Sequence, residues 1–303
     1  MDAPLLSTRQ LRYFEAVARL GHFGRAAEQC GVSQPALSMQ ISELEQQLGV
    51  SLIERRSKGV VLTEAGRDIA ERARSILAAL RDVSDFAASC RAPLSAPIRL
   101  GVIPTIGPYL LPQVLVALRA RHPGLELAIR ETQTRTLTAE LLAGTLDLLL
   151  LALPIEHPDI ETLEIATDRF LLAAPPDHTF GPRVRISPER IVNDRLLLLE
   201  EGHCLRDQAL AVCNLQPVGA MNTLGVSTLA TVVQMVANGL GLTLLPEISI
   251  PHETAHGNVK LLRFAKPEPK RIIGLAWRRS SPRVRDFTAL GEIIKAALPK
   301  LGG

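Results

Sequence analysis

A chain of 303 residues, 47% of them hydrophobic and 21% charged, is long enough for two or three compact domains and too apolar for an intrinsically disordered protein. Its formal net charge of +3 permits nucleic-acid binding without predicting it, so a DNA-binding function has to be argued from sequence patterns. No apolar run reaches the ~20 residues of a membrane span, and four cysteines do not make a disulfide framework, so we expect a cytoplasmic protein without membrane contact.

Three helices are predicted at the N-terminus, over residues 8–20, 24–30 and 33–48. Gly31 allows a tight turn between the second and third helices, and Ser33 is a suitable cap for the third. A helix, a short turn and a second helix in this order are typical of a helix-turn-helix.

A short hairpin with a basic tip, a wing, is expected next, over residues 52–62. A long helix follows over residues 63–89, and its apolar residues recur on one face. A helix of this length is unusual in a globular domain and suggests a linker that pairs with a second copy of the chain. The alternative, that the apolar face packs on its own domain, stays open. Residues 91–97 contain two prolines and mark the best domain boundary.

Short apolar strands alternate with helices in the rest of the chain. Strands are expected over residues 98–103, 125–130, 146–153, 170–174, 196–199, 241–245, 259–264 and 272–277. Helices are expected near residues 108–120, 137–143, 206–213, 227–237 and 284–298. This alternation predicts an α/β domain with a mostly parallel sheet.

Cys204 lies in the segment whose residues most clearly indicate a chemical reaction. The residues that follow Gly202 contain no helix breaker, so Cys204 is expected at a helix N-terminus, where the helix dipole favours an anion and lowers a thiol pKa. His203 and Arg206 can add hydrogen bonds or positive charge. A thiolate in such a setting is what peroxide attacks, and a second thiol can convert the resulting sulfenic acid to a disulfide.

Cys213 lies nine residues after Cys204. If the intervening segment is helical, the two Cα atoms are ~13 Å apart at ~1.5 Å per residue, whereas a disulfide needs them within ~7 Å. Bond formation would have to melt the helix, so oxidation and conformational change would be one event. For any one cysteine taken alone, a buried, small, chemically inert side chain is the simpler interpretation.

The stretch from Arg25 to Ser38 resembles the helix-turn-helix of the LysR-type transcription regulators. The resemblance implies an α/β protein with an N-terminal winged helix-turn-helix, a long linker helix and a two-lobed effector domain like that of periplasmic binding proteins. The implied domains are residues 1–63, 64–96 and 97–303, with lobe I formed by 97–170 and 274–303 and lobe II by 171–273.

The same resemblance implies double-stranded promoter DNA as a partner, with the start of the recognition helix in the major groove. Base edges would be contacted by Gln34, Pro35 and Ser38, and phosphates by Ser33, Arg55, Arg56 and Lys58. The alternative is a helical bundle whose polar residues are simply solvated.

Further motifs resemble the peroxide-sensing branch of this family, over nearly the whole chain. They are residues 103–112, the turn at residues 132–134, residues 199–213 and residues 266–271. By this resemblance Cys204 reacts with peroxide and Cys213 resolves the product; Thr105 and Thr134 hold peroxide, Arg271 supports the thiolate, and His203, Arg206 and Asp207 order the pocket. Simple helix capping explains the two threonines equally well, and Asp207 could be a partner of the helix dipole.

The resemblance also implies a regulator of oxidative-stress genes that is not an enzyme, forms homodimers or homotetramers, works with RNA polymerase and needs neither cofactor nor metal. Two alternatives remain: a LysR-type regulator that binds a small metabolite between its lobes, and a thiol peroxidase. One departure is Thr223-Leu224, where the family commonly carries a His-Phe pair. Cys30 is expected in the core of the N-terminal domain, and Cys90 is assigned no role.

Overall fold

The computed structural model describes residues 6–56, 59–89, 92–181, 184–191, 194–212, 226–255 and 258–298. The chain divides into two compact units, one of residues 1–84 with 143–145 and the other of residues 85–142 with 146–303. Within the described ranges, no helix has the length and apolar character needed to cross a membrane.

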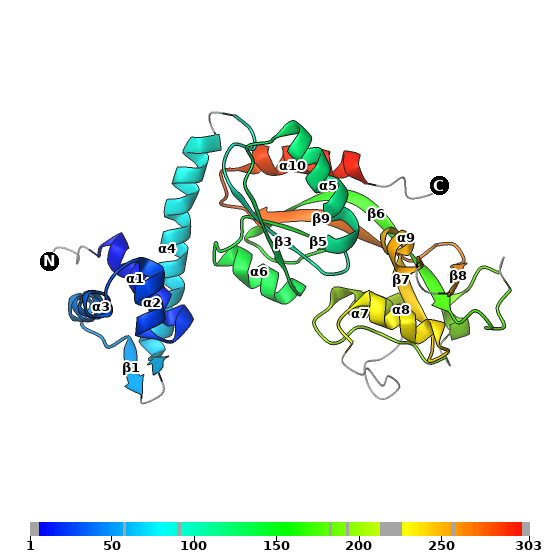
Figure 1. Ribbon diagram of the computed structural model, residues 1–303, viewed down its shortest axis with the longest axis horizontal. Helices are drawn as coiled ribbons and strands as arrows, with labels where there is room; N and C mark the ends of the chain where they lie inside the picture. The colour runs from blue at the N-terminus through cyan, green and yellow to red at the C-terminus, as the bar shows by residue number, and fades with distance from the viewer. Residues whose placement is uncertain are drawn as a thin grey trace. The chain divides into compact units, whose positions relative to one another are not determined.

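The first unit begins with the three expected helices, α1 (Thr8–Leu20), α2 (Phe23–Cys30) and α3 (Gln34–Leu48). Ser33 caps α3 by accepting a hydrogen bond from the Ala36 N–H, and Gly31 ends α2 with a φ of +69°, a conformation that favours glycine. β1 (Ile53–Arg56) and β2 (Gly59–Leu62) then pair antiparallel as the wing. The helix-turn-helix and its hairpin are therefore confirmed (Figure 1).

α4 (Glu64–Ser89) is the expected long helix. Thr63 caps it by accepting a hydrogen bond from the Gly66 N–H at 2.8 Å. Ala70 and Ala73 in its first half are buried, whereas the apolar side chains farther along stay exposed by 45% at Ile76, 44% at Leu80 and 69% at Val83. Ala78 in the second half is buried too, so the apolar face of α4 is buried at its alanines and exposed at its larger side chains.

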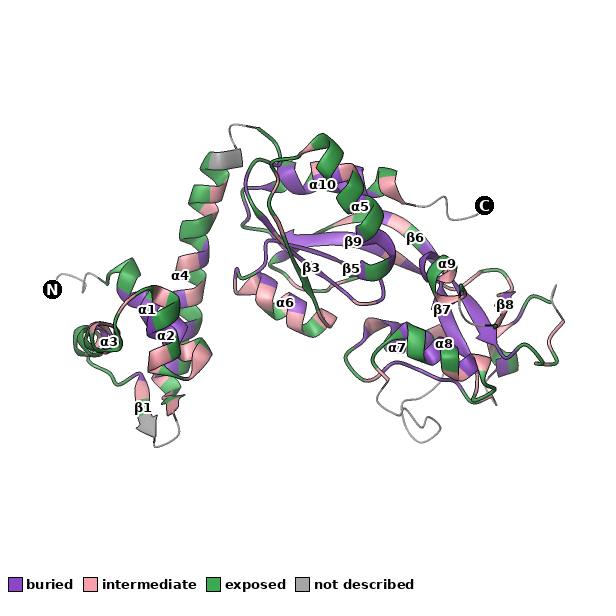
Figure 2. Ribbon diagram, viewed as in Figure 1, coloured by how far each residue is buried: buried purple, intermediate pink, exposed green. Residues whose placement is uncertain are grey.

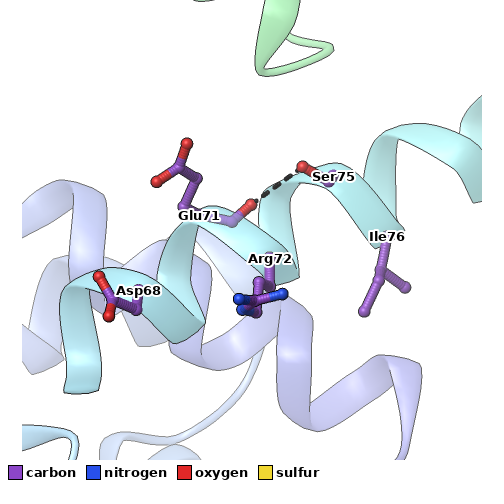
Figure 3. A pocket seen from close by; sticks show the side chains of 5 residues that line it. All are labelled: Asp68, Glu71, Arg72, Ser75 and Ile76. Carbon is purple, nitrogen blue, oxygen red and sulfur yellow. Dashed lines mark hydrogen bonds between the residues drawn. The ribbon is translucent and has the colours of Figure 1, made fainter.

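An open surface pocket lies beside the first half of α4 (Figure 3). Its lining residues are Asp68, Glu71, Arg72, Ser75 and Ile76, and the Ser75 hydroxyl donates to the carbonyl of Glu71 at 3.2 Å. All five residues come from one exposed helix and their charges are mixed, so we assign no ligand to this pocket.

The second unit is built on a seven-stranded sheet in the order β4-β3-β5-β9-β6-β7, with β8 also pairing with β6. The strands are β3 (Ile98–Val102), β4 (Leu127–Glu131), β5 (Leu148–Leu153), β6 (Ile160–Ala174), β7 (Thr243–Pro246), β8 (Lys260–Arg263) and β9 (Lys270–Arg278). Among the strands β3 to β9 of the described residues, only the pairs of β3 with β4 and with β5 are parallel, so the expectation of a mostly parallel sheet is wrong. The reason is that the chain leaves the first lobe along β6 and returns along β9, which runs opposite to both of its neighbours.

Helices complete two α/β lobes on this sheet, as expected. In the first lobe α5 (Gly107–Arg121) and α10 (Val284–Ala297) lie on one face and α6 (Thr134–Leu142) on the other (Figure 1). The second lobe carries α7 (Cys204–Val212), α8 (Leu229–Ala237), α9 (Ile250–Glu253) and the short helices η1 (Pro188–Ile191) and η2 (Glu247–Ser249). The strand expected at residues 196–199 is reduced to a single bridge between Leu196 and Leu242. Figure 2 shows the strands β5 and β9 as the buried centre of the first lobe.

Candidate functional site

Cys204 is the first residue of α7 and is a free thiol. It faces a small pocket whose walls come from the turn after β3, the turn before α6 and the start of α7. The lining residues are Ile103, Pro104, Thr105, Gln133, Thr134, His203 and Cys204. The pocket encloses at most about 160 Å³ of empty space. The structure therefore brings together four residues of the predicted peroxide site: the thiol, both threonines and the histidine.

The hydroxyl of Thr134 is buried and makes no hydrogen bond of ordinary geometry with another described residue, although it is near enough to the Cys204 thiol to lower the pKa of that thiol. α6 begins at this residue, but its hydroxyl accepts no capping hydrogen bond. Buried polar atoms are nearly always paired in folded proteins, so an unpaired one that lines a pocket indicates a place for a ligand atom. Helix capping thus does not explain Thr134.

Thr105 is held by Arg271. The Nη1 group of Arg271 donates to Thr105 Oγ1 and its Nη2 group donates to the Thr105 carbonyl, both at 2.9 Å. Thr105 does not cap α5 either, because the cap position is Ile106, which makes no side-chain capping bond. Arg271 is buried in turn against Asp168, whose Oδ2 lies 2.9 Å from Arg271 Nε.

The pKa of Cys204 lies above its ordinary value. Burial is the largest cause, and the charge of Arg271 and the hydroxyl of Thr134 oppose it, whereas the Asp207 carboxylate adds to the rise. The expected lowering by the helix N-terminus is therefore wrong as a net result. The N–H of Leu205 does favour the thiolate, but the loss of solvation in the pocket outweighs it.

Of the predicted residues next to Cys204 in the sequence, some line the pocket and others lie outside it. His203 is buried and lines the pocket, with its Nε2 3.7 Å from the Glu200 carboxylate. Arg206 is also buried but points back to the preceding loop, where it donates to the Leu199 carbonyl at 3.5 Å. Asp207 is exposed in the first turn of α7. Neither Arg206 nor Asp207 lines the pocket, so an ordering role for either would act from outside it.

Three polar residues near the site had not been predicted. Gln133 lines the pocket and donates from Nε2 to the Glu201 carbonyl at 3.2 Å. Gln208, four residues after Cys204 and on the same face of α7, has a buried Oε1 atom without a hydrogen-bond partner in the described part of the chain. Asp168, the third, lies on β6 and follows no motif. Only the helical spacing of Gln208 could have been found in the sequence.

Several predicted residues lie outside the described part of the chain. They are Cys213, the Thr223-Leu224 pair, Cys90 and Lys58. The helix that was to separate Cys204 from Cys213 is present as α7, which extends to Val212. Cys30 packs against the core of the first unit, as expected, and burial raises the pKa of its thiol.

The predicted DNA-contacting residues lie at the start of α3 and on the wing. Ser33, Gln34 and Pro35 are exposed and Ser38 is half-buried. Arg55 and Arg56 belong to β1, although their side chains are not described. Met39, which had not been predicted, follows Ser38 and is 64% exposed, an unusual degree for a large apolar side chain at this place. An exposed apolar side chain here is suited to contact a thymine methyl group.

Comparison with known proteins identifies a family for the N-terminal part of the chain and another for the rest. The bacterial regulatory helix-turn-helix family, lysR type, matches residues 8–67, and the LysR substrate binding domain family matches residues 91–299. A probable hydrogen peroxide-inducible genes activator of Streptomyces viridosporus is 43% identical over 97% of this chain and 95% of its own. The DNA-binding transcriptional dual regulator OxyR of Escherichia coli K12 is 39% identical over 97% of this chain and 96% of its own.

Solved structures of similar proteins agree with these relatives. A full-length OxyR variant from Pseudomonas aeruginosa has a TM-score of 0.79 and 37% identity, and the match covers 96% of this chain and 95% of that one. A Corynebacterium glutamicum OxyR mutant with bound H2O2 has a TM-score of 0.67 and 35% identity, and that match covers 98% and 94% of the two chains.

Proposed function

The chain belongs to the LysR family of bacterial transcription regulators, and on that basis we propose that it senses hydrogen peroxide through Cys204 and controls oxidative-stress genes by binding promoter DNA. One observation carries the proposal: a free thiol shares one small pocket with the buried hydroxyl of Thr134, which lowers the pKa of that thiol and makes no other hydrogen bond within the described ranges. Peroxide is a small molecule that accepts and donates hydrogen bonds, and it reacts with thiols. The OxyR names of the relatives and the bound H2O2 of one of them add support.

The first chemical step joins the Cys204 sulfur to one oxygen of peroxide. The S–O bond forms as the O–O bond breaks, the sulfur loses two electrons to peroxide, and the thiol proton ends on the departing oxygen, which leaves as water. The product is a sulfenic acid. In the second step the Cys213 sulfur attacks the Cys204 sulfur, the S–O bond breaks, a second water leaves and the disulfide remains. The hydroxyls of Thr105 and Thr134 and the ring of His203 would hold the peroxide oxygens.

The size of the pocket argues against a small metabolite as the signal. Pockets for organic ligands usually have ~300–1,000 Å³, several times more than peroxide needs. The pocket at Cys204 encloses at most about 160 Å³. These walls leave too little space for an organic metabolite, and they would have to move apart slightly even for peroxide, which is hardly larger than water.

A peroxide titration separates a sensor from a thiol peroxidase. The full-length protein, reduced and then freed of reductant, should consume about one equivalent of peroxide per chain and stop, because a disulfide formed once per chain uses one equivalent. With a thiol reductant present, a sensor should turn over slowly, whereas sustained rapid consumption would assign the chain to the peroxidases. No consumption by the reduced protein would contradict the proposal itself.

The raised pKa of Cys204 predicts a pH dependence. Because the pocket favours the thiol, the thiolate fraction at neutral pH should be small and should grow as the pH rises. We expect the rate of Cys204 alkylation by iodoacetamide to keep rising above the usual thiol pKa of ~8.5, at higher pH than the rate of the unfolded control. The rate is measured by mass spectrometry of the Cys204 peptide, with urea-unfolded protein as the control. A rate that is already constant below about pH 6 would show a lowered pKa instead.

The DNA-binding role predicts two different mutant phenotypes. Gln34→Ala should lose discrimination between operator and random DNA, by ~1–3 kcal/mol for a lost bidentate base contact. Arg55→Ala should instead weaken binding to all sequences and flatten the salt dependence, because it removes a phosphate contact. Both are measured by fluorescence anisotropy with an operator selected from random DNA by the protein itself. Equal losses on both DNAs for Gln34→Ala would show that α3 has been placed wrongly.

The exposed part of α4 supports assembly with a second copy. Ile76, Leu80 and Val83 form an apolar row on a helix between the two functional parts of the chain. We infer a homodimer through this row, and a homotetramer when dimers associate on separated half-sites, with RNA polymerase as the partner at the promoter.

The division of labour follows the expected domains. Residues 1–63 would bind DNA, residues 64–96 would link, and residues 97–303 would sense. Within the sensor, lobe I would comprise residues 97–170 and 274–303, and lobe II residues 171–273.

A further inference from the structure

We propose that Asp168 is a positioning residue of the peroxide site, which holds the guanidinium of Arg271 so that the Thr105 hydroxyl donates its proton into the pocket. This inference rests on the proposed reaction of Cys204 with peroxide. Asp168 lies on β6, outside the pocket and far in sequence from every other residue of the site.

The first step of the argument is the geometry of Asp168. Its side chain is 0% exposed. Oδ2 accepts from Arg271 Nε at 2.9 Å, and Oδ1 accepts from the N–H of Ile248 at 3.1 Å. Asp168 and Arg271 are direct neighbours across the β6–β9 pair. The carboxylate is thus fixed from two sides, one on β9 and one at η2.

The second step is the rigidity of Arg271. A guanidinium is a planar fork, so fixing Nε also fixes the directions of the two Nη groups. Both Nη groups donate to Thr105, one to its hydroxyl oxygen and one to its carbonyl. Without Asp168 the buried guanidinium would lose the carboxylate that fixes its Nε group, and only its two bonds to Thr105 would orient it.

The third step concerns the one proton of the Thr105 hydroxyl. Because Thr105 Oγ1 already accepts a hydrogen bond from Arg271, its own proton is available for another acceptor. Thr105 lines the pocket, and the structure records no other hydrogen bond of this hydroxyl within the described ranges. The proton is therefore available to a peroxide oxygen. Donation from a cation also makes the hydroxyl a stronger donor, which suits an oxygen that gains negative charge as the O–O bond breaks.

A buried ion pair is a weak source of stability, because the desolvation of both charges offsets their attraction. Burial raises the pKa of Asp168, the charge of Arg271 and the N–H of Ile248 oppose that rise, and Glu247 adds to it. The pair therefore has an energetic cost that a role at the neighbouring pocket would explain.

The chain offers a matched control in the pair of Arg283 with Asp286. Arg283 Nε lies 3.0 Å from Asp286 Oδ2, and Asp286 Oδ1 accepts from the N–H of Leu94 at 3.0 Å. The Nη groups of Arg283 donate to the carbonyls of Pro97 and Ala96. Burial and geometry are thus closely similar, although Arg283 also lies 3.7 Å from the Asp85 carboxylate. The Nη groups of this guanidinium bond to backbone carbonyls and do not reach the pocket of Cys204.

The experiment compares Asp168→Asn with Asp286→Asn in the full-length chain. Two rates are measured by quenched mass spectrometry of the Cys204 peptide, one for oxidation by hydrogen peroxide and one for alkylation by iodoacetamide, which needs no proton from Thr105. Asp168→Asn should lower the ratio of the peroxide rate to the alkylation rate by at least about tenfold, whereas Asp286→Asn should change it by less than about threefold. A structural role alone would not separate the two reagents.

A double-mutant cycle tests the route through Thr105. If Asp168 acts by orienting that hydroxyl, Asp168→Asn should add little further loss in a Thr105→Val background. Fully additive losses, or an Asp168→Asn ratio equal to that of the unsubstituted protein, would overturn the inference while leaving the proposed function intact. An unsubstituted chain whose Cys204 does not react with peroxide would instead overturn the proposed function.

Folding of each variant is checked by thermal melting. If Asp168→Asn does not fold, Asp168→Glu, which keeps the charge but moves the carboxylate, takes its place under the same criterion. If neither Asp168 variant folds while Asp286→Asn does, Asp168 serves the stability of the domain and the positioning role is wrong.

Discussion

Cys204→Ser is expected to abolish the reaction with peroxide and with it every peroxide-dependent change in DNA binding. A serine hydroxyl is not oxidised by peroxide, and the remaining pocket residues supply only hydrogen bonds. Cys213→Ser should behave differently: Cys204 should still form its sulfenic acid, which then persists or oxidises further because no second thiol resolves it. The measurement is trapping of the sulfenic acid with dimedone, followed by mass spectrometry of the intact protein.

Two controls fix the interpretation. Cys30→Ser should react like the unsubstituted chain, since Cys30 is a partly buried residue packed against the core of the first unit and does not line the pocket of Cys204. The second control is the comparison of Cys204→Ser with Cys213→Ser, which must give different oxidation products after treatment with peroxide. If both variants respond alike, the division into an attacking and a resolving thiol is wrong.

The second large effect is expected in α7 itself. In the reduced protein the amides from Leu205 to Val212 should be protected from hydrogen exchange, because they belong to a helix that buries Leu205, Ala209 and Leu210. Formation of the disulfide should raise exchange in this segment by at least about tenfold, since a helix of nine residues cannot bring its ends within bonding distance. The helices α1 to α3 should keep their protection.

The unwinding also has a consequence for the redox potential. Loss of helical hydrogen bonds and of buried apolar contacts opposes the disulfide, so the bond should be reduced more readily than structural disulfides, whose potentials lie below about −300 mV. Ready reduction makes the signal reversible. Unchanged exchange in α7 after complete oxidation, or a reduced structure with the two sulfurs already in bonding distance, would contradict the coupling of oxidation to refolding.

The local parts of the fold could be predicted from the sequence. The caps and turns at Gly21, Gly31 and Ser33 act over three or four residues. The limits of the helix-turn-helix can therefore be predicted from neighbouring residues in the sequence. The same holds for the length of α4 and for the start of α7 at Cys204. Thr105 and Thr134 were found only because their motifs resemble those of a known family.

The non-local parts could not be predicted. Strand order depends on contacts between distant segments, and nothing near β9 in sequence says that it inserts between β5 and β6. The partnership of Asp168 with Arg271 has the same origin, since 103 residues separate the two. The direction of the Cys204 pKa shift was wrong for a related reason: the helix dipole can be recognised locally, but the desolvation comes from the residues of other turns that surround the thiol.

The central claim, that Cys204 is the residue through which the chain senses peroxide, is tested most directly by site-resolved mass spectrometry of the unsubstituted protein after one equivalent of peroxide per chain. We predict that a sulfenic acid appears first at Cys204, followed by a disulfide between Cys204 and Cys213, while Cys30 and Cys90 remain thiols. Oxidation that begins at Cys30 or Cys90, or a Cys204 thiol that survives the dose unchanged, would contradict it.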